Sequence, residues 1–492
     1  MSAVFECTAK FLLFDYFRVP YRLVQGSETE NLNVCRPVAD EPRPALYWPR
    51  LDDAGPQAYG PFLLRGLTFH ARVIPDETAG TWLRSSGSDW TPVESIRAGS
   101  GESVGSVWRS AEGDLFLPFE PGEAIESFWT ERYDTRATRK VKRALLRSYY
   151  AARPYLPRRV QIGMRRLLAR VQARRRFPRW PLESSLHDLY DLIFEYVAEV
   201  AGAPVPGLSL WPGGLSWALV LTHDVETEFG YEQLGTLRDA EHDLGYRSSW
   251  NFVPKRYDVE DDVVRSLSND GFEVGVHGLY HDGRDLESRA MLTARLPEIE
   301  RYKHRWGAVG FRSPATHRDR ELMPLLPFTY DSSYPDSDPF EPRSGGCCSL
   351  LPFHADGLVE LPITLPQDHT LFVILRQDDA SLWLEKSTEI RRRGGMALVI
   401  THPDYMTAPE RMTAYCSLLS TYVDDETAWR ALPRDVADWW NRRAASRVEV
   451  EGTEWTVVGP AADDATVAWY GGPSEGIDPG AQRRAPLAEE AA

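Results

Sequence analysis

Two histidines four residues apart, together with an acidic pair on an earlier segment, have the residue types of a metal site. His277 and His281 follow one apolar run, and Asp224 and Glu226 follow another. Two imidazoles and one carboxylate leave an open position on Zn²⁺ or a similar ion, as catalytic zinc sites do. The pattern therefore predicts a metal site made of His277, His281 and a carboxylate from Asp224 or Glu226. Gly278 stands where an HExxH zinc protease has its general-base Glu, which excludes that class.

Side chains with catalytic chemistry recur at the ends of short apolar runs. Nine of the eleven histidines lie between His223 and His402, and over residues 215–446 apolar runs alternate with longer helical patterns. This alternation predicts parallel strands separated by helices. In a closed parallel barrel the C-terminal strand ends meet on one face, where such enzymes place their chemistry. Four runs show the pattern: 218–222 precedes His223, 272–276 precedes His277, 308–311 precedes Arg312, and 397–401 precedes His402.

These segments, taken together, resemble the motifs of the polysaccharide deacetylase family, the NodB-homology or carbohydrate esterase family 4 group. The resemblance covers residues 215–446, less than half of the chain, and the motifs occur in the family's order. The chain departs from the family at Glu226, because the family usually has two adjacent aspartates in this motif. It also has Gly278 where Ser or Thr is common, Tyr334 where Trp is common, and Ala315 where Tyr is common. The matching segments are 224–226, 277–281, 311–314, 330–334 and 399–402.

The resemblance implies a distorted (β/α) barrel and the metal-dependent hydrolysis of an N-acetyl group on a sugar. The metal it implies is divalent, with Zn expected and Co, Ni or Mn as alternatives. If the family's roles are carried over to this chain, Asp224 is the base and Glu226 is the metal carboxylate. Glu226 is one methylene longer than the family's usual aspartate, so Asp224 remains an alternative metal ligand. Arg312 would pair with Asp224, and protonated His402 would be the acid. Asp331 would orient Arg312 or His402, or have a structural role at its strand end.

Other readings of the same residues stay open. A hydrolase of another non-peptide amide C–N bond needs the same groups, and a non-catalytic carbohydrate-binding protein could retain the fold. Residues 367–369, Gln-Asp-His, follow a strand end and are candidates for the pocket lining, although a turn histidine is the commoner case. Four aromatic residues are candidates for stacking on sugar faces: Trp250, Tyr280, Trp306 and Tyr405.

Charge is distributed unevenly along the chain. The net charge is −16, yet sixteen Lys and Arg and no acidic residue lie between Thr135 and Trp180. Apolar residues recur at helical spacing inside this block, which predicts a basic amphipathic helix. Its partner is expected to be anionic: a membrane surface, a lipid-linked sugar phosphate, or the protein's own acidic surface. No nucleic acid is expected, because an acidic chain without a recognised binding motif is a poor candidate.

The 492 residues are enough for several domains, and 42% hydrophobic residues are enough for a core, which excludes wholesale disorder. We expect a mostly-β N-terminal module over 1–130, a basic helical connector over 131–205, the barrel over 215–446, a small β appendage over 447–470 and a disordered tail over 471–492. No apolar run approaches the roughly 20 residues that span a bilayer. Five cysteines and an N-terminus unlike a secretory signal predict a cytoplasmic protein, with the inner membrane surface as a peripheral contact of residues 136–179.

Overall fold

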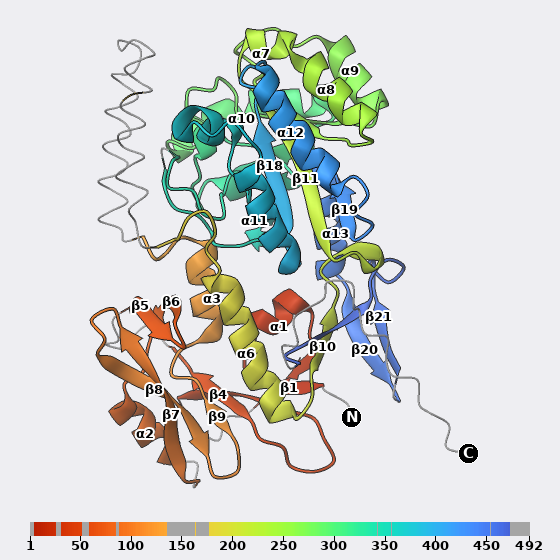
Figure 1. Cartoon of the computed structure of the whole chain (residues 1–492). Coiled ribbons are helices and arrows are strands. Elements are labelled where there is room, and N and C mark those ends of the chain that lie inside the picture. Colours follow the sequence, from red (N-terminus) through yellow and green to blue (C-terminus); the bar gives the residue numbers. More distant parts are fainter. Residues whose placement is uncertain are drawn as a thin grey trace.

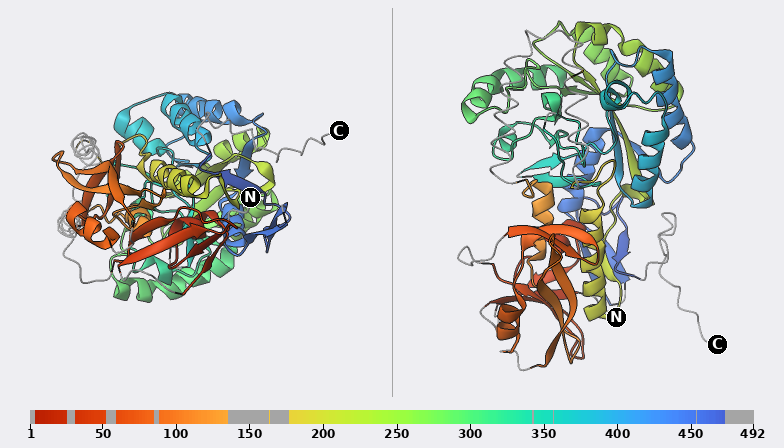
Figure 2. Two further views of the ribbon diagram at one scale, coloured as in Figure 1. Left: turned by 90° about the horizontal axis from the view of Figure 1, so that it is seen from below. Right: turned by 60° about the vertical axis from the view of Figure 1, so that its left-hand side comes forward.

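The computed structural model describes residues 4–25, 31–51, 59–84, 88–134, 163, 177–341, 343–355, 357–452 and 454–472. The predicted basic helix lies almost entirely outside these residues, and so does nearly all of the predicted C-terminal tail. Within the described part of the chain, no helix is long and apolar enough to cross a membrane. All five cysteines are free. Two lobes are visible in Figure 1 and in both views of Figure 2: an N-terminal β-sheet with its helices, and a second lobe of strands and helices.

The N-terminal lobe is built on one nine-stranded, mostly antiparallel sheet with the strand order β2-β1-β3-β4-β9-β8-β7-β5-β6. Helices α3 and α6 pack against β6, while α2 contacts β7 and β8. The strands are β1 (Phe5–Cys7), β2 (Tyr21–Leu23), β3 (Leu32–Pro37), β4 (Leu46–Pro49), β5 (Tyr59–Leu64), β6 (Leu67–Arg72), β7 (Trp90–Ala98), β8 (Ser103–Ser110) and β9 (Leu115–Phe116), and the helices are α1 (Leu12–Phe17), α2 (Asp76–Arg84), α3 (Pro121–Trp129) and α6 (Ser185–Ala201).

The second lobe is a mixed α/β unit around a curled sheet with the order β16-β17-β15-β14-β13-β12-β11-β18, in which β19 also pairs with β11. All of its pairs are parallel except β16 with β17. The strands are β11 (Trp217–Val225), β12 (Ser249–Phe252), β13 (Glu273–Val276), β14 (Gly310–Phe311), β15 (Tyr330–Asp331), β16 (Phe353–Ala355), β17 (Leu358–Glu360), β18 (Met396–Thr401) and β19 (Ala428–Ala431).

Helices cover this sheet in the alternation that the sequence predicts. They are α7 (Glu228–Glu232), α8 (Leu234–Asp243), α9 (Asp261–Asn269), α10 (Arg289–Trp306), α11 (Ser381–Arg392), α12 (Pro409–Tyr422) and α13 (Pro433–Ala444). Every residue of β11 is buried, as expected for a parallel strand covered on both faces. The mixed α/β class is therefore confirmed for this part of the chain.

The segment that follows β17 reaches β18 through individual hydrogen bonds instead of a regular strand pair. After β17, the backbone N–H of Ile363 donates to the carbonyl of Tyr334, at 2.8 Å. Two residues later, the N–H of Leu365 donates to the carbonyl of Leu398 in β18, at 2.9 Å. The Thr364 hydroxyl donates to the carbonyl of Met396, at 2.6 Å. The sheet thus curls toward the distorted barrel that the resemblance implies.

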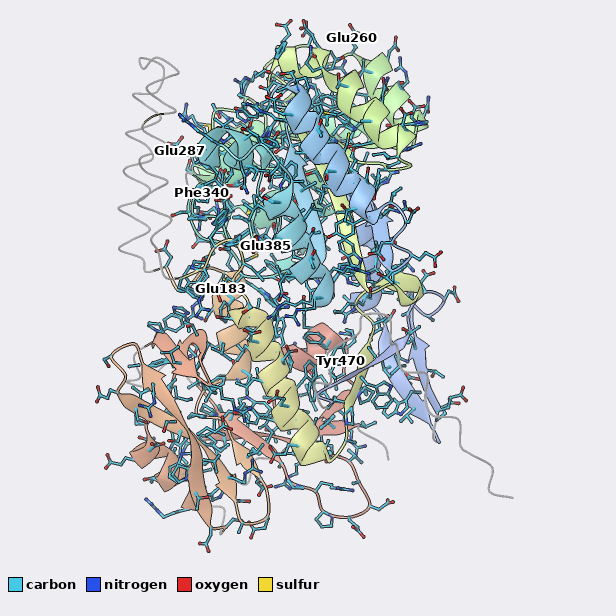
Figure 3. All side chains as sticks on the ribbon, in the orientation of Figure 1. Glu183, Glu260, Glu287, Phe340, Glu385 and Tyr470 are labelled. Atoms are coloured by element: carbon cyan, nitrogen blue, oxygen red, sulfur yellow. The ribbon has the colours of Figure 1, made fainter. Side chains whose placement is uncertain are left out.

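The strands within residues 447–470, where a small β appendage is expected, pair in two different places. β20 (Arg447–Glu451) and β21 (Glu454–Val458) form a hairpin, but β22 (Val467–Tyr470) pairs with β10 (Val205–Leu208), which precedes the barrel in the chain. Tyr470 stacks on Phe194 of α6 with 4.8 Å between ring centroids, at the position labelled in Figure 3. β22 therefore packs against α6, while β20 of the hairpin contacts β10.

Buried arginines join the two lobes. Arg443 of α13 donates to the carbonyls of Tyr16 and Ser209, at 2.6 and 2.9 Å. Arg318, in the loop after β14, forms a buried ion pair with Glu131, just beyond α3. A buried charge without partners is costly, so these contacts stabilise the packing of the two lobes.

Glu273, the first residue of β13, gives a test of this packing. It is buried, accepts from the Tyr330 hydroxyl at 2.6 Å and from the Arg434 backbone N–H at 2.9 Å, and burial raises its pKa to about 7. The pKa of Glu273 is higher in the folded protein than in the unfolded chain, so the protonated carboxyl group contributes to the free energy of unfolding. This contribution is fully present below about pH 4.5 and is lost as the pH rises through about 7. It amounts to at most about 3 kcal/mol. We expect Glu273→Gln to remove this component, measured by urea unfolding at pH 5 and pH 8. Equal pH dependence in both proteins would contradict it.

Candidate active site

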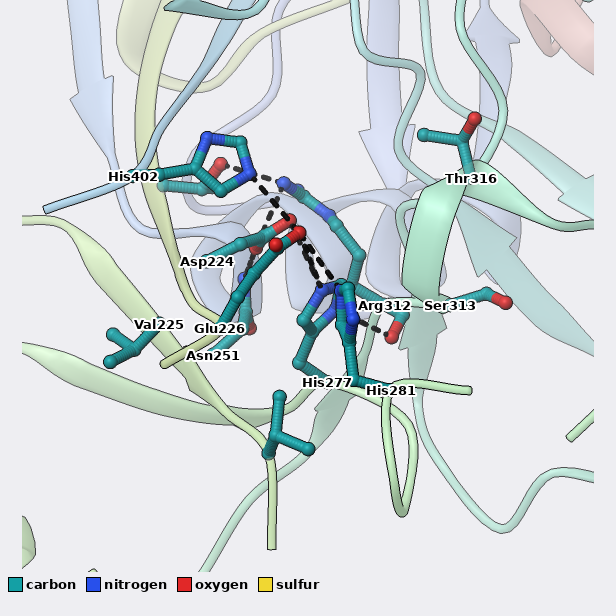
Figure 4. Close-up of polar contacts among 12 residues, drawn as sticks. Asp224, Val225, Glu226, Asn251, His277, His281, Arg312, Ser313, Thr316 and His402 are labelled. Carbon is teal, nitrogen blue, oxygen red and sulfur yellow. Dashed lines mark hydrogen bonds and ion pairs between the residues drawn. The ribbon is translucent and has the colours of Figure 1, made fainter. Parts of the chain in front are cut away.

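The ends of three strands of the curled sheet bring the predicted residues together. Asp224 lies at the end of β11, His277 directly follows β13 and His402 directly follows β18. Because β11 pairs in parallel with both β12 and β18, and β12 with β13, these ends lie on one edge of the sheet. In Figure 1 that edge points toward α7 and away from the N-terminal sheet. Figure 4 shows the side chains of all three residues converging.

Glu226, His277 and His281 form a group that could hold a metal ion. Their ligand atoms all lie within 4.8 Å of one another. The His281 Nε2 is 2.9 Å and the His277 Nε2 is 3.9 Å from the Glu226 Oε1. Of the two carboxylates that the sequence leaves open, Glu226 is the one grouped with both imidazoles. Of the two imidazoles, Asp224 is close only to that of His277, with 3.8 Å between the Asp224 Oδ2 and the His277 Nε2.

The donor set of this group fits a divalent cation. The His277 Nδ1 lies 3.1 Å from the carbonyl of Arg312, so a neutral ring donates its Nδ1–H there and leaves a lone pair on Nε2. Among the described residues, neither this buried Nε2 nor that of His281 has a hydrogen-bond partner. A buried polar atom without a partner is costly, and a bound cation would supply one. Two imidazoles and a carboxylate are also ligands that Zn²⁺ accepts.

Asp224 is held by hydrogen bonds from two sides. Its Oδ1 accepts from the Asn251 amide at 3.0 Å and from Arg312 at 3.4 Å. Strand register explains the first contact, because Asp224 lies opposite Asn251 and Asn251 opposite Gly275. A Cβ at Gly275 would lie 2.1 Å from the Asn251 Oδ1, so only glycine leaves room for this amide. Burial alone would raise the pKa of Asp224, but the nearby positive charges, Arg312 foremost, hold it below its usual value.

His402 is paired with a carboxylate of its own. Its Nδ1 lies 2.7 Å from the Asp368 Oδ1, and its backbone N–H donates to the Asp368 Oδ2 at 2.6 Å. Its other ring nitrogen points toward Glu226, 3.6 Å from the Oε1. Burial alone would lower the pKa of His402, but Asp368 raises it well above the usual value. The imidazole is therefore suited to carry a proton at neutral pH.

Asp331 does not contact His402. Its carboxylate accepts from the Ser333 backbone N–H and hydroxyl, both at 2.9 Å, and it lies beside the buried Glu360. Burial raises the pKa of Asp331 to about 6. Arg312 reaches the Ser332 hydroxyl and the Thr222 hydroxyl instead, at 2.9 and 3.0 Å. The carboxylate that orients His402 is Asp368, from the 367–369 segment that the sequence offered only as a lining of the pocket.

Two of the four aromatic candidates for sugar stacking are unsuitable. Trp250 is fully buried and Trp306 is 5% exposed, so both belong to the core. Tyr280, between the two metal-site histidines, is 45% exposed, and the Arg295 guanidinium lies over its ring at 4.9 Å. Tyr405 is partly exposed, with 5.3 Å between its ring centroid and that of His402. Only these two have a surface that a ligand can reach.

Comparison with known proteins finds similarity to solved structures only. No family model and no curated protein matches the chain. A probable polysaccharide deacetylase from Pseudomonas aeruginosa PAO1 is 18% identical over 47% of this chain and 93% of its own, with a TM-score of 0.38. Puue allantoinase is 17% identical over 47% and 92%, with a TM-score of 0.38. A family 4 carbohydrate esterase from Streptomyces lividans, in complex with acetate, is 14% identical over 44% and 91%, with a TM-score of 0.27.

Proposed function

We propose that this protein is a metal-dependent hydrolase that removes N-acetyl groups from a sugar. The observation that carries the proposal is the grouping of Glu226, His277 and His281 between an ionised Asp224 on one side and His402 on the other. A hydrolase of an unactivated amide needs these three functions: an electrophilic centre, a base and an acid. Their positions at strand ends of one sheet edge are typical of barrel enzymes.

Glu226, His277 and His281 would hold the cation. A divalent ion bound there would polarise the amide carbonyl and make water more acidic. Zn is the ion we expect, because two imidazoles and one carboxylate leave it an open position, and Co, Ni or Mn would accept the same ligands.

Asp224 takes the proton of the attacking water in this proposal. Arg312 and Asn251 keep its carboxylate ionised and oriented, since both donate to the Oδ1. The Oδ2 then faces His277 and the candidate metal position. General-base assistance of this kind typically contributes a factor of about 10²–10⁴ to the rate.

His402 supplies the proton that the departing amine needs. Asp368 holds the ring by its Nδ1 and stabilises the imidazolium, so the proton on Nε2 is directed toward the group of metal ligands. An amine leaves poorly as an anion, which is why an acid placed opposite the base matters for an amide. The arrangement resembles a histidine–aspartate pair in which the aspartate fixes the ring orientation.

The substrate we propose is an N-acetylated sugar in a polysaccharide precursor or on a nucleotide or lipid carrier. The sequence-based expectation of a cytoplasmic location favours a precursor over a mature wall polymer. Another non-peptide amide would use the same groups, so the substrate assay has to include one.

Metal content and acetate release test this proposal together. We expect purified protein to bind one divalent ion per chain, and His277→Ala to lose it while keeping its circular dichroism spectrum. Wild-type protein should release acetate from N-acetylglucosamine-containing donors, and His277→Ala should not. Release of product only from a non-sugar amide would favour the second kind of hydrolase, and a protein that binds sugar without metal or turnover would be a non-catalytic binding protein.

A further inference from the structure

The two imidazoles of the proposed metal site have different neighbours at their Nδ1 atoms. The His277 Nδ1 faces the carbonyl of Arg312, which only accepts a hydrogen bond. The His281 Nδ1 lies 2.8 Å from the Nη1 of Arg256, and a guanidinium only donates. His277 therefore carries its proton on Nδ1, whereas a neutral His281 must leave Nδ1 bare and carry its proton on Nε2.

This difference decides which ring is ready to bind a cation. The Nδ1–H of His277 leaves a free lone pair on its Nε2. The Nε2 of His281, 2.9 Å from the Glu226 Oε1, carries the proton of the neutral ring as long as the Nδ1 accepts from Arg256. While Arg256 holds the Nδ1 of His281, the proton on the other ring nitrogen blocks its Nε2 as a ligand.

We infer that Arg256 competes with the metal for His281 and must leave its Nδ1 when the cation binds; the inference rests on the proposed function. For Nε2 to become a ligand, its proton goes to solvent and Nδ1 takes one from solvent, with no net change. The new Nδ1–H would then face the N–H of Arg256, so this hydrogen bond cannot persist. A metal-bound histidine normally donates its second N–H to an acceptor, as His277 does here.

Arg256 is placed so that it can move. It is exposed, and it has no carboxylate partner among the residues that the structure describes. Its neighbour Lys255, by contrast, is paired with Glu298 at 2.9 Å. Losing one exposed hydrogen bond costs only about 1 kcal/mol, so the side chain can be displaced without disturbing the barrel.

A pair of variants separates the effect of the Arg256–His281 hydrogen bond on metal affinity from the effect of removing a positive charge. Arg256→Met and Lys255→Met each remove one positive charge from adjacent positions, but only Arg256 contacts His281. We expect Arg256→Met to bind Zn²⁺ at least about tenfold more tightly than wild type, in the range that changes around metal ligands produce. Lys255→Met should stay within about threefold. The measurement is competition of the metal-depleted full chain against a chromophoric chelator.

Nitrogen NMR of the histidine rings tests the tautomer directly. In metal-free wild type, His281 should be protonated on Nε2 and His277 on Nδ1; Zn²⁺ should convert His281 to the Nδ1–H form. His281→Gln identifies the signal. Equal affinity in Arg256→Met and wild type, or a metal-free His281 already protonated on Nδ1, would overturn the inference alone. Absence of Zn²⁺ binding in every variant would overturn the proposed function and the inference with it.

Discussion

Replacing Asp224 by Asn is expected to lower kcat by about 10²–10⁴ while the protein keeps its metal, because Asn has nearly the same shape but cannot take a proton from water. The amide can still accept the hydrogen bonds that Asn251 and Arg312 donate to the Oδ1. The ligands Glu226, His277 and His281 are untouched. The measurement is acetate release at saturating substrate, with metal content determined on the same sample.

The control for this variant is its metal stoichiometry together with KM. A loss confined to kcat, with one ion per chain, is the signature of a group that acts in the transition state. If Asp224→Asn instead loses the ion, Asp224 is a ligand, and Glu226 is not the sole metal carboxylate. A variant that holds its ion and works within about threefold of wild type would contradict the assignment of the base.

Much of the site could be predicted because its residues lie at the ends of strands. A buried parallel strand has a strong apolar pattern, and the first polar residue after it marks the sheet edge. Asp224, His277, Arg312 and His402 were found in this way, and the structure brings them together. The choice between Asp224 and Glu226 could not be made from spacing, since it depends on how far each side chain reaches past β11.

The role of Asp368 could not be predicted from local pattern. It lies 34 residues before His402 and outside any strand, at the start of the irregular helix His369–Leu375. Asp331 was the more regular candidate because it ends β15, yet its carboxylate is used by Ser333. The signal that pointed to residues 367–369 was their position after a strand end, and only the three-dimensional path of this loop connects it with β18.

The contact between Arg256 and His281 is equally invisible in the sequence. Arg256 lies in the turn after β12, and an exposed arginine in a turn normally interacts with water. His281 adopts a left-handed backbone conformation with φ 56°, which L-residues rarely use. This turn of the chain is part of what brings the ring to Glu226 on one side and Arg256 on the other.

Replacing Asp368 by Asn is expected to move the alkaline limb of the kcat–pH profile toward lower pH by about 1–3 units. His402 must be protonated to act as the acid, and its pKa is raised chiefly by the Asp368 charge against the opposing effect of burial. Without that charge the imidazolium loses its proton at a lower pH. Activity should therefore fall most at pH 8, by roughly 10–100-fold, and much less at pH 6, because the acid form is restored there. A uniform loss at every pH, with the limb unmoved, would mean that Asp368 only positions the loop. The difference between the two outcomes is large because the carboxylate is fully buried against the ring, where water cannot replace its charge.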